Sequence, residues 1–151
     1  MEPIYFDHAA TTQVLPEAAQ AALTAMREEY GNPSSQYALG KRAAQALAAH
    51  REAVAQALGC QAGEVYFTSG GTEGDNWAIS LAAHLGRHRG KHIITTAVEH
   101  AAVLEPCKAL EAQGYQVTYL TPGPDGRVKV ADLEAALRPD TVLVSMMLVN
   151  N

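Results

Sequence analysis

The chain has 151 residues, of which 48% are hydrophobic and 18% charged, which is the composition of a globular domain with a sizeable core. Its formal net charge of -5 argues against a surface that binds nucleic acid or an anionic membrane. The sequence has no leader-like start and no apolar run long enough to cross a bilayer. We therefore expect a cytoplasmic protein whose partners are small molecules or proteins.

Two helices are predicted in the N-terminal third of the chain. Apolar residues recur at helical spacing between Pro16 and Tyr30, and Pro16 stands where a helix can begin. The segment "GNPSSQYALG" interrupts this pattern, and a longer amphipathic helix then runs as far as Gly59. The short run "IYF" at residues 4–6 is the only strand expected before these helices.

From Glu64 onward, short apolar runs alternate with helical segments. Strands are expected at "VYFTS", "HIITT", "YQVTYLT" and "TVLVSMMLV", and helices at about 72–87, 101–113 and 130–137. Apolar, β-branched runs that alternate with helices are typical of a parallel sheet covered on both faces. The predicted fold class is therefore α/β, with a mainly parallel sheet, helices on both of its faces, and N-terminal helices before it.

Ligands of open parallel sheets bind beyond the carboxyl ends of the strands, so the residues that follow each strand are candidates for a site. The first segment that follows a strand, here called a tail, is "TSGGTE". Its paired glycines allow a ligand to come close to the backbone, and Thr72 can cap the next helix or offer its hydroxyl to an anion. Asp75 follows Thr72 at the spacing of a capping box. A phosphate site and a plain capped helix are both compatible with this turn. The Walker and dinucleotide-binding patterns are absent.

Two further tails carry polar side chains. "TTAVEH" places His100, after Glu99, at a helix N-terminus, where the dipole favours a neutral imidazole that can accept a proton or stack on a flat ring. A histidine at such a place is also a common cap or packing residue. "VNN" ends in two amides that point to opposite faces of a strand, so one of them can face a ligand. His84 and His88 have a metal-like spacing, but their basic neighbours favour a solvated helix end, and no metal site is predicted.

Several motifs follow one another in the order and at the spacing of a known family. They are "IYFDHAATT", "GNPSS", "FTSGGTEGDN", "TTAVEH" followed by "AVL", and "LVSMMLVNN". With these motifs the whole chain resembles the NifS/IscS-type cysteine desulfurases, which are pyridoxal-phosphate-dependent, class V aminotransferase-like enzymes of fold type I. The resemblance implies that residues 1–15 are an N-terminal segment near the active site and that 16–151 are the N-terminal part of the cofactor-binding large domain.

The resemblance also implies roles for individual residues. Gly71 and Thr72 match positions that bind the cofactor phosphate, and Asn151 matches the asparagine beside the phenolic oxygen of the cofactor. His100 matches the histidine that stacks on the pyridine ring, and it is the candidate acid/base for the substrate thiol. "DHAATT", residues 7–12, resembles the segment near the substrate entrance.

The activity that the resemblance implies is removal of sulfur from L-cysteine, which gives L-alanine and an enzyme persulfide. The expected partners are a sulfur-acceptor or scaffold protein of iron–sulfur cluster assembly or thiolation, and a second copy of the chain in a homodimer. A selenocysteine lyase or related lyase with the same cofactor, and a non-catalytic fragment, are the alternatives. The product formed and the absorbance of the cofactor distinguish the three.

The sequence departs from the family pattern at two points. Tyr37 stands where the pattern has a histidine, and the family continues well beyond the position of Asn151. The Schiff-base lysine and the sulfur-accepting cysteine of the family match none of the residues present, which are Lys41, Lys91, Lys108, Lys129, Cys60 and Cys107. We therefore expect the activity to belong to a longer protein, and the 151 residues alone to be inactive.

Overall fold

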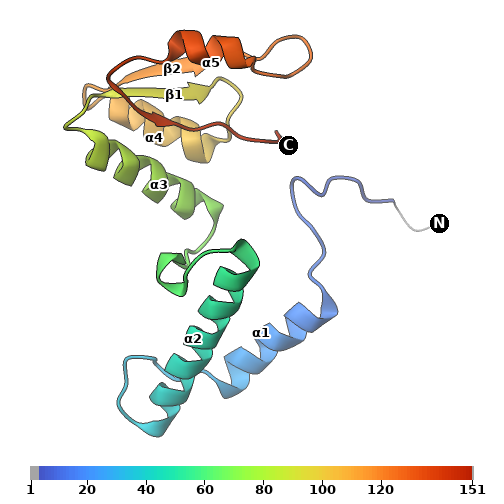
Figure 1. Ribbon diagram of the computed structural model, residues 1–151. Helices are drawn as coiled ribbons and strands as arrows, with labels where there is room; N and C mark the ends of the chain where they lie inside the picture. Colours follow the sequence, from blue (N-terminus) through green and yellow to red (C-terminus); the bar gives the residue numbers. More distant parts are fainter. Residues whose placement is uncertain (1–3, 151) are drawn as a thin grey trace. The chain divides into compact units, whose positions relative to one another are not determined.

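The computed structural model describes residues 4–150, which divide into two compact units between Phe67 and Thr68 (Figure 1). The first unit contains helices α1 (Pro16–Glu28) and α2 (Ala38–Leu58) and the short 3₁₀ helix η1 (Ala62–Glu64). Helix α1 begins at its proline, and α2 ends at Gly59, whose left-handed conformation (φ 70°) suits a residue without a side chain. Both predicted helices are confirmed.

The N-terminal segment of this unit is not a strand, so the prediction for residues 4–6 is wrong. The Tyr5 hydroxyl donates hydrogen bonds to the carbonyl oxygens of Asp7 (2.7 Å) and Thr11 (2.9 Å), which closes a loop over "DHAAT". Ile4 and Phe6 are exposed. A β-strand needs the backbone of a neighbour, and none of the strands in the described chain pairs with these residues.

The second unit is built on a parallel sheet of three strands. The strands are β1 (His92–Thr96), β2 (Gln116–Leu120) and β3 (Thr141–Val144). Their order is β2–β1–β3, and β1 pairs in parallel with both neighbours, with Ile93 opposite Val117 and Leu143. The predicted α/β class with a parallel sheet is confirmed.

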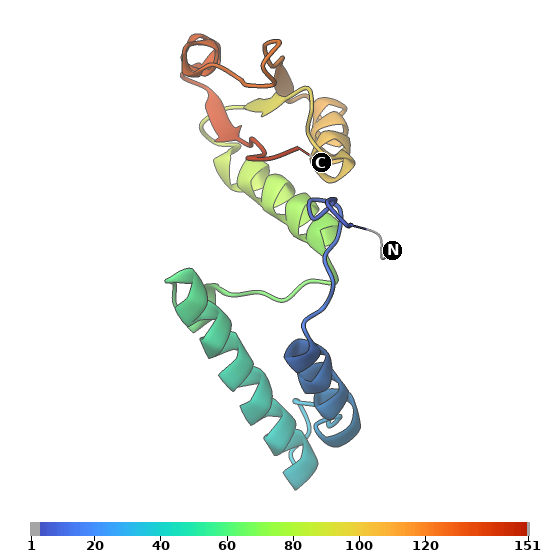
Figure 2. The same cartoon turned by 90° about the vertical axis from the view of Figure 1, so that its right-hand side faces the viewer.

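Helices cover both faces of this sheet, as predicted. They are α3 (Gly71–Gly86), α4 (Ala101–Glu111) and α5 (Val130–Ala136). In Figure 1, α3 and α4 lie on one face and α5 on the other. The turned view in Figure 2 shows β3 (red) beside α3. A side chain at Gly86 of α3 would place its Cβ 2.7 Å from the Cβ of Val142, so this contact requires glycine.

The core of the unit lies between the sheet and the helices α3 and α4. It consists of Ile79, Ala83, Ile93, Val103, Cys107 and Leu110. Burial raises the pKa of the Cys107 thiol, and the nearby carboxylates of Glu111 and Glu99 raise it further. Cys107 is therefore a packing residue, whereas Cys60 of the first unit is exposed.

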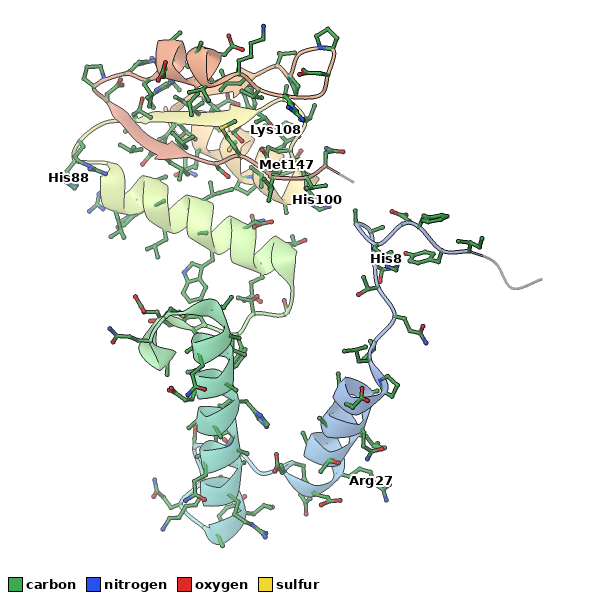
Figure 3. All side chains as sticks on the ribbon, turned by 45° about the vertical axis from the view of Figure 1, so that its right-hand side comes forward. His8, Arg27, His88, His100, Lys108 and Met147 are labelled. Atoms are coloured by element: carbon green, nitrogen blue, oxygen red, sulfur yellow. The ribbon has the colours of Figure 1, made fainter. Side chains whose placement is uncertain are left out.

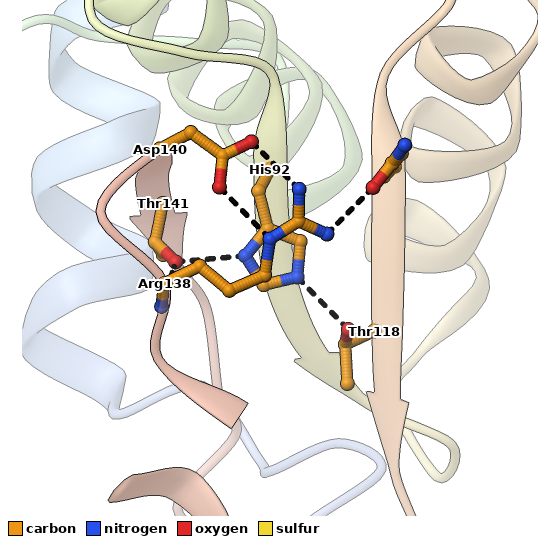
Figure 4. Close-up of polar contacts among 6 residues, drawn as sticks. His92, Thr118, Arg138, Asp140 and Thr141 are labelled. Carbon is orange, nitrogen blue, oxygen red and sulfur yellow. Dashed lines mark hydrogen bonds and ion pairs between the residues drawn. The ribbon is translucent and has the colours of Figure 1, made fainter. Parts of the chain in front are cut away.

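A buried histidine joins the three strands at their N-terminal ends (Figure 4). The ring of His92, which is fully buried, lies 2.7 Å from the Thr141 hydroxyl through Nδ1 and 2.9 Å from the Thr118 hydroxyl through Nε2. Burial lowers the pKa of His92, and the neighbouring Arg138 guanidinium lowers it further, whereas Asp140 opposes the change. The neutral ring thus bridges β1 to both edge strands.

Two predicted strands differ from the structure. Residues 65–69, expected as a strand, pair with none of the strands in the described chain. The run "TVLVSMMLV" forms a strand only over its first four residues; the Ser145 N–H still donates to the Ile94 carbonyl, and 146–150 leave the sheet. The local pattern was apolar in both cases, but a strand depends on backbone partners that the pattern does not specify.

Candidate cofactor site

The N-terminal end of helix α3, here called its open end, is the first element of the site. Gly70 is the N-cap residue, and no side-chain oxygen of the described chain caps the helix there. A Cβ added at Gly70 or Gly71 would meet nothing within 4 Å, and both glycines are exposed, so no other part of the described chain packs on them. The first N–H groups of a helix have no acceptor within the helix, and they carry the positive end of its dipole. This end therefore suits an anion.

The predicted capping box at this end is wrong. Thr72 lies inside the helix and is not the N-cap, and Asp75 makes no capping bond to it. Glu73 instead reaches back to Ser69 and accepts hydrogen bonds from its backbone N–H (2.6 Å) and its hydroxyl (2.7 Å). These two bonds lower the pKa of the Glu73 carboxyl. The hydroxyl of the exposed Thr72 takes no part in capping the helix.

His100 begins helix α4 as its N-cap residue. Its Nδ1 accepts a hydrogen bond from the backbone N–H of Ala102 at 3.0 Å. The capping role considered for this histidine is therefore present, and its catalytic role stays a prediction. Because Nδ1 accepts the cap bond, the N–H of the ring lies on Nε2, which is the nitrogen left for other contacts.

Asn76 connects the starts of α3 and α4. Its amide nitrogen donates to the carbonyl oxygens of Thr72 (2.8 Å) and Ala102 (3.3 Å). The Ala102 carbonyl would ordinarily accept from the N–H of residue 106, but that residue is Pro106, which has no N–H. The asparagine thus supplies the donor that the proline lacks, and it places the open end of α3 beside the helix that starts at His100.

The segment after β3 runs past the segment after β1. The amide nitrogen of Asn150 donates to the Val98 carbonyl at 2.6 Å, and the Met147 N–H donates to the buried carboxylate of Glu99 at 2.8 Å. Figure 3 shows His100 and Met147 next to each other. Asn151, the predicted neighbour of the phenolic oxygen, lies outside the described residues.

A hollow of about 210 Å³ opens where these elements meet. It is lined by Asp75, Glu99, His100, Val103, Ser145, Met146 and Met147. The structure thus brings His100, the residues after β3 and the first turns of α3 and α4 into one region, as expected from the position of the strand tails. The sequence analysis gave no role to Asn76, and it noted Glu99 only as the neighbour of His100. A signal for Asn76 was present, because a proline inside the helix expected at 101–113 leaves one carbonyl oxygen in need of another donor.

Other candidates are not among the residues that line this hollow. His88 lies at the opposite end of α3 from Gly71 (Figure 3), and residues 4–150 contain no group of three metal-binding side chains. Lys108 pairs with Glu105, which raises its pKa. Residues 7–12 belong to the first unit. No helix of the described chain is long and apolar enough to span a membrane.

Known proteins resemble the chain over nearly its whole length. The curated cysteine desulfurase IscS of Methanosarcina thermophila is 49% identical over 148 residues, which are 98% of this chain and 37% of that protein. A solved structure titled "NifS-like protein" matches 97% of this chain and 40% of its own, with a TM-score of 0.91 and 40% identity. A second structure, "SspA in complex with cysteine", matches 97% of this chain and 42% of its own, with a TM-score of 0.87 and 36% identity.

These matches confirm the resemblance to the NifS/IscS group, and the chain spans about 37% of the length of the curated relatives that it matches. The family described as aminotransferase class-V matches residues 4–151. Enzymes of this family depend on pyridoxal phosphate. The chain belongs to the class V aminotransferase family.

Proposed function

We propose that the protein containing this chain is a pyridoxal-phosphate-dependent cysteine desulfurase, which releases sulfur from L-cysteine and leaves L-alanine. The observation that carries the proposal is the uncapped end of α3, held by Asn76 beside the helix that His100 caps. Support comes from relatives of 49% identity that are named cysteine desulfurases, and from a solved neighbour described in complex with cysteine.

The residues present fit the phosphate group of the cofactor. The glycine pair leaves the helix end accessible, and no side chain of the described residues occupies its N-cap position. Backbone N–H groups from Gly71 onward and the Thr72 hydroxyl are the donors that a phosphate dianion requires. The Glu73 carboxylate, the nearest negative charge in this turn, is directed back to Ser69 by two hydrogen bonds.

The other assigned residues act on the ring and the substrate. When bound, pyridoxal phosphate supplies an electron sink for the reacting carbon. His100 would stack on the ring, and because Nδ1 accepts the cap bond, its Nε2–H would be the group that donates a hydrogen bond to the sulfur of the substrate. Asn151 would bind the phenolic oxygen of the cofactor. Residues 1–15 would be the N-terminal segment near the active site, with 7–12 near the substrate entrance, and 16–151 would form the first part of the large domain.

The remaining features follow from the same family. We propose a homodimer located in the cytoplasm, with the sulfur passed as a persulfide to an acceptor or scaffold protein for iron–sulfur cluster assembly or thiolation. Neither nucleic acid nor a membrane is a partner, in keeping with the net charge of -5.

The phosphate assignment is tested by titrating the cofactor-free, full-length protein with pyridoxal phosphate. Thr72→Ala removes one hydrogen bond to a charged group, worth about 1.5–3 kcal/mol, so the affinity should fall by roughly tenfold or more. Ser80→Ala, an exposed hydroxyl on the same helix, is the matched control and should bind like the wild type. Equal affinities for the wild type and Thr72→Ala would contradict the assignment.

A further inference from the structure

Glu99 is a buried carboxylic acid in the loop between β1 and helix α4. Only 8% of the residue is exposed, yet its hydrogen-bond partners are neutral. Its Oε1 accepts from the Thr96 hydroxyl at 2.9 Å and from the Met147 N–H at 2.8 Å. Burying a carboxyl group is unfavourable unless hydrogen bonds satisfy it, so these two bonds point to a role beyond packing.

The contact with Met147 replaces a bond of the sheet. The Ser145 N–H donates to the Ile94 carbonyl at 2.9 Å, as in a regular parallel ladder. The next N–H on that side belongs to Met147, and in a continued ladder it would donate to the Thr96 carbonyl. It donates to Glu99 instead, while Glu99 also holds the Thr96 hydroxyl. Glu99 therefore ends the pairing of β1 with β3.

The end of this ladder determines the path of two segments of the site. One is the segment after β3, which Asn150 ties again to the Val98 carbonyl (2.6 Å). The other is the start of α4, because His100 follows Glu99 directly and caps the helix through Nδ1. Both segments contribute to the hollow that Glu99 itself lines. The Oε1 atom of Glu99 thus links the segment after β3 to the segment that leads into α4.

We propose that Glu99 is a positioning residue, whose Oε1 ends the β1–β3 ladder and fixes where His100 and residues 145–150 lie. This inference rests on the proposed function for its effect on turnover, but not for its effect on the structure. It predicts that the position of the oxygen matters and that the negative charge does not.

Two substitutions separate position from charge. Glu99→Gln keeps an acceptor oxygen in the place of Oε1 without the charge, whereas Glu99→Asp keeps the charge and withdraws the oxygen by one methylene. Glu105→Ala removes an exposed carboxylate from α4, the helix that follows Glu99, and is the control. All variants are made in the full-length protein, alone and, for Glu99→Asp, together with His100→Ala.

The first readout is amide hydrogen exchange over residues 145–150 without cofactor. Glu99→Asp should raise the exchange rate there by about tenfold, because the bond to the Met147 N–H is weakened. Glu99→Gln and Glu105→Ala should leave the rate close to that of the wild type. Unchanged exchange in Glu99→Asp, or an equal rise in Glu99→Gln, would overturn the proposal.

The second readout is kcat for alanine formation from cysteine. Glu99→Asp should lower kcat by up to about 10²-fold, the size of effect that a 1 Å misplacement produces, and Glu99→Gln should preserve it. In the His100→Ala background the same change should cost little, because the residue acts through His100. An equal loss in both backgrounds would overturn the link to His100.

The two proposals fail in different ways. If His100→Ala alone keeps the wild-type kcat, the role proposed for His100 is wrong, and the exchange rates still decide whether Glu99 positions residues 145–150. If the exchange rates are unaltered while His100→Ala is inactive, Glu99 is not the positioning residue and the proposed function stands.

Discussion

The link between Asn76 and Pro106 gives a prediction that combines two residues on different helices. In the wild type, Asn76 is the side-chain donor to the Ala102 carbonyl, which Pro106 deprives of its helical partner. Asn76→Ala removes that bond and the shorter one to Thr72. Pro106→Ala returns an N–H at the position from which the carbonyl can be satisfied within α4.

The magnitude follows from the geometry. A net hydrogen bond contributes about 0.5–1.5 kcal/mol, and a buried acceptor left without a donor costs about 1–3 kcal/mol. Ala102 is buried, and the bond of 3.3 Å is a long one, so we expect Asn76→Ala to lower the free energy of unfolding by about 1–2 kcal/mol. In the Pro106→Ala background the loss should be about half as large, which gives a coupling energy near 0.5–1 kcal/mol.

The assay is urea unfolding of the wild type, the two single variants and the double variant, followed by far-UV circular dichroism. Similar m values in all four proteins are required before the free energies are compared. A coupling energy within about 0.3 kcal/mol of zero would refute the reasoning, since the two residues would then act independently.

Three further predictions concern other side chains. His100→Ala should lower the rate of cysteine turnover by roughly 10²–10⁴-fold while the cofactor content changes little, and near-wild-type turnover at saturating cysteine would contradict the acid/base role. The pKa of His92 is lowered from its ordinary value of 6.5, so its contribution to stability is complete above that pH and is lost as the pH falls below it, by at most about 1.4 kcal/mol per pH unit. Plotted against pH, the free energies of unfolding of the wild type and His92→Gln should therefore diverge below pH 6.5. Parallel curves would show that His92 does not titrate as described. A thiol reagent should modify Cys60 in the native protein but Cys107 only on unfolding, because Cys107 is buried and its pKa is raised, and mass spectrometry of the labelled peptides would reveal the opposite order.

The helices were predictable from the sequence because their signals are local. Pro16 and Gly59 mark helix ends by their own backbone preferences, and the apolar period of each helix is contained within it. Strands β1 and β2 were also predicted, since helices separate them and most of their residues are apolar or β-branched. The strands expected at residues 4–6 and 65–69 failed because pairing depends on a distant neighbour.

The location of the site was predictable from the sequence, but the hydrogen bonds that connect its segments were not. The rule that strand tails face ligands brought His100 and the segment before Asn151 to attention. The contacts that connect them join residues 48 and 52 positions apart, Glu99 with Met147 and Val98 with Asn150. Such side-chain to backbone bonds leave no periodic trace in a sequence. The cap expected from Thr72 was wrong for a local reason, because the helix begins at Gly71 and Glu73 turns back to Ser69.

The most direct measurement is the yield of alanine from L-cysteine by the purified full-length protein loaded with pyridoxal phosphate, with the released sulfur quantified in the presence of a thiol reductant. We expect alanine and sulfide in equal amounts over many turnovers, and a rate that collapses in His100→Ala. The absence of alanine, or selective release of selenide from selenocysteine while cysteine is left intact, would contradict the assignment of a cysteine desulfurase.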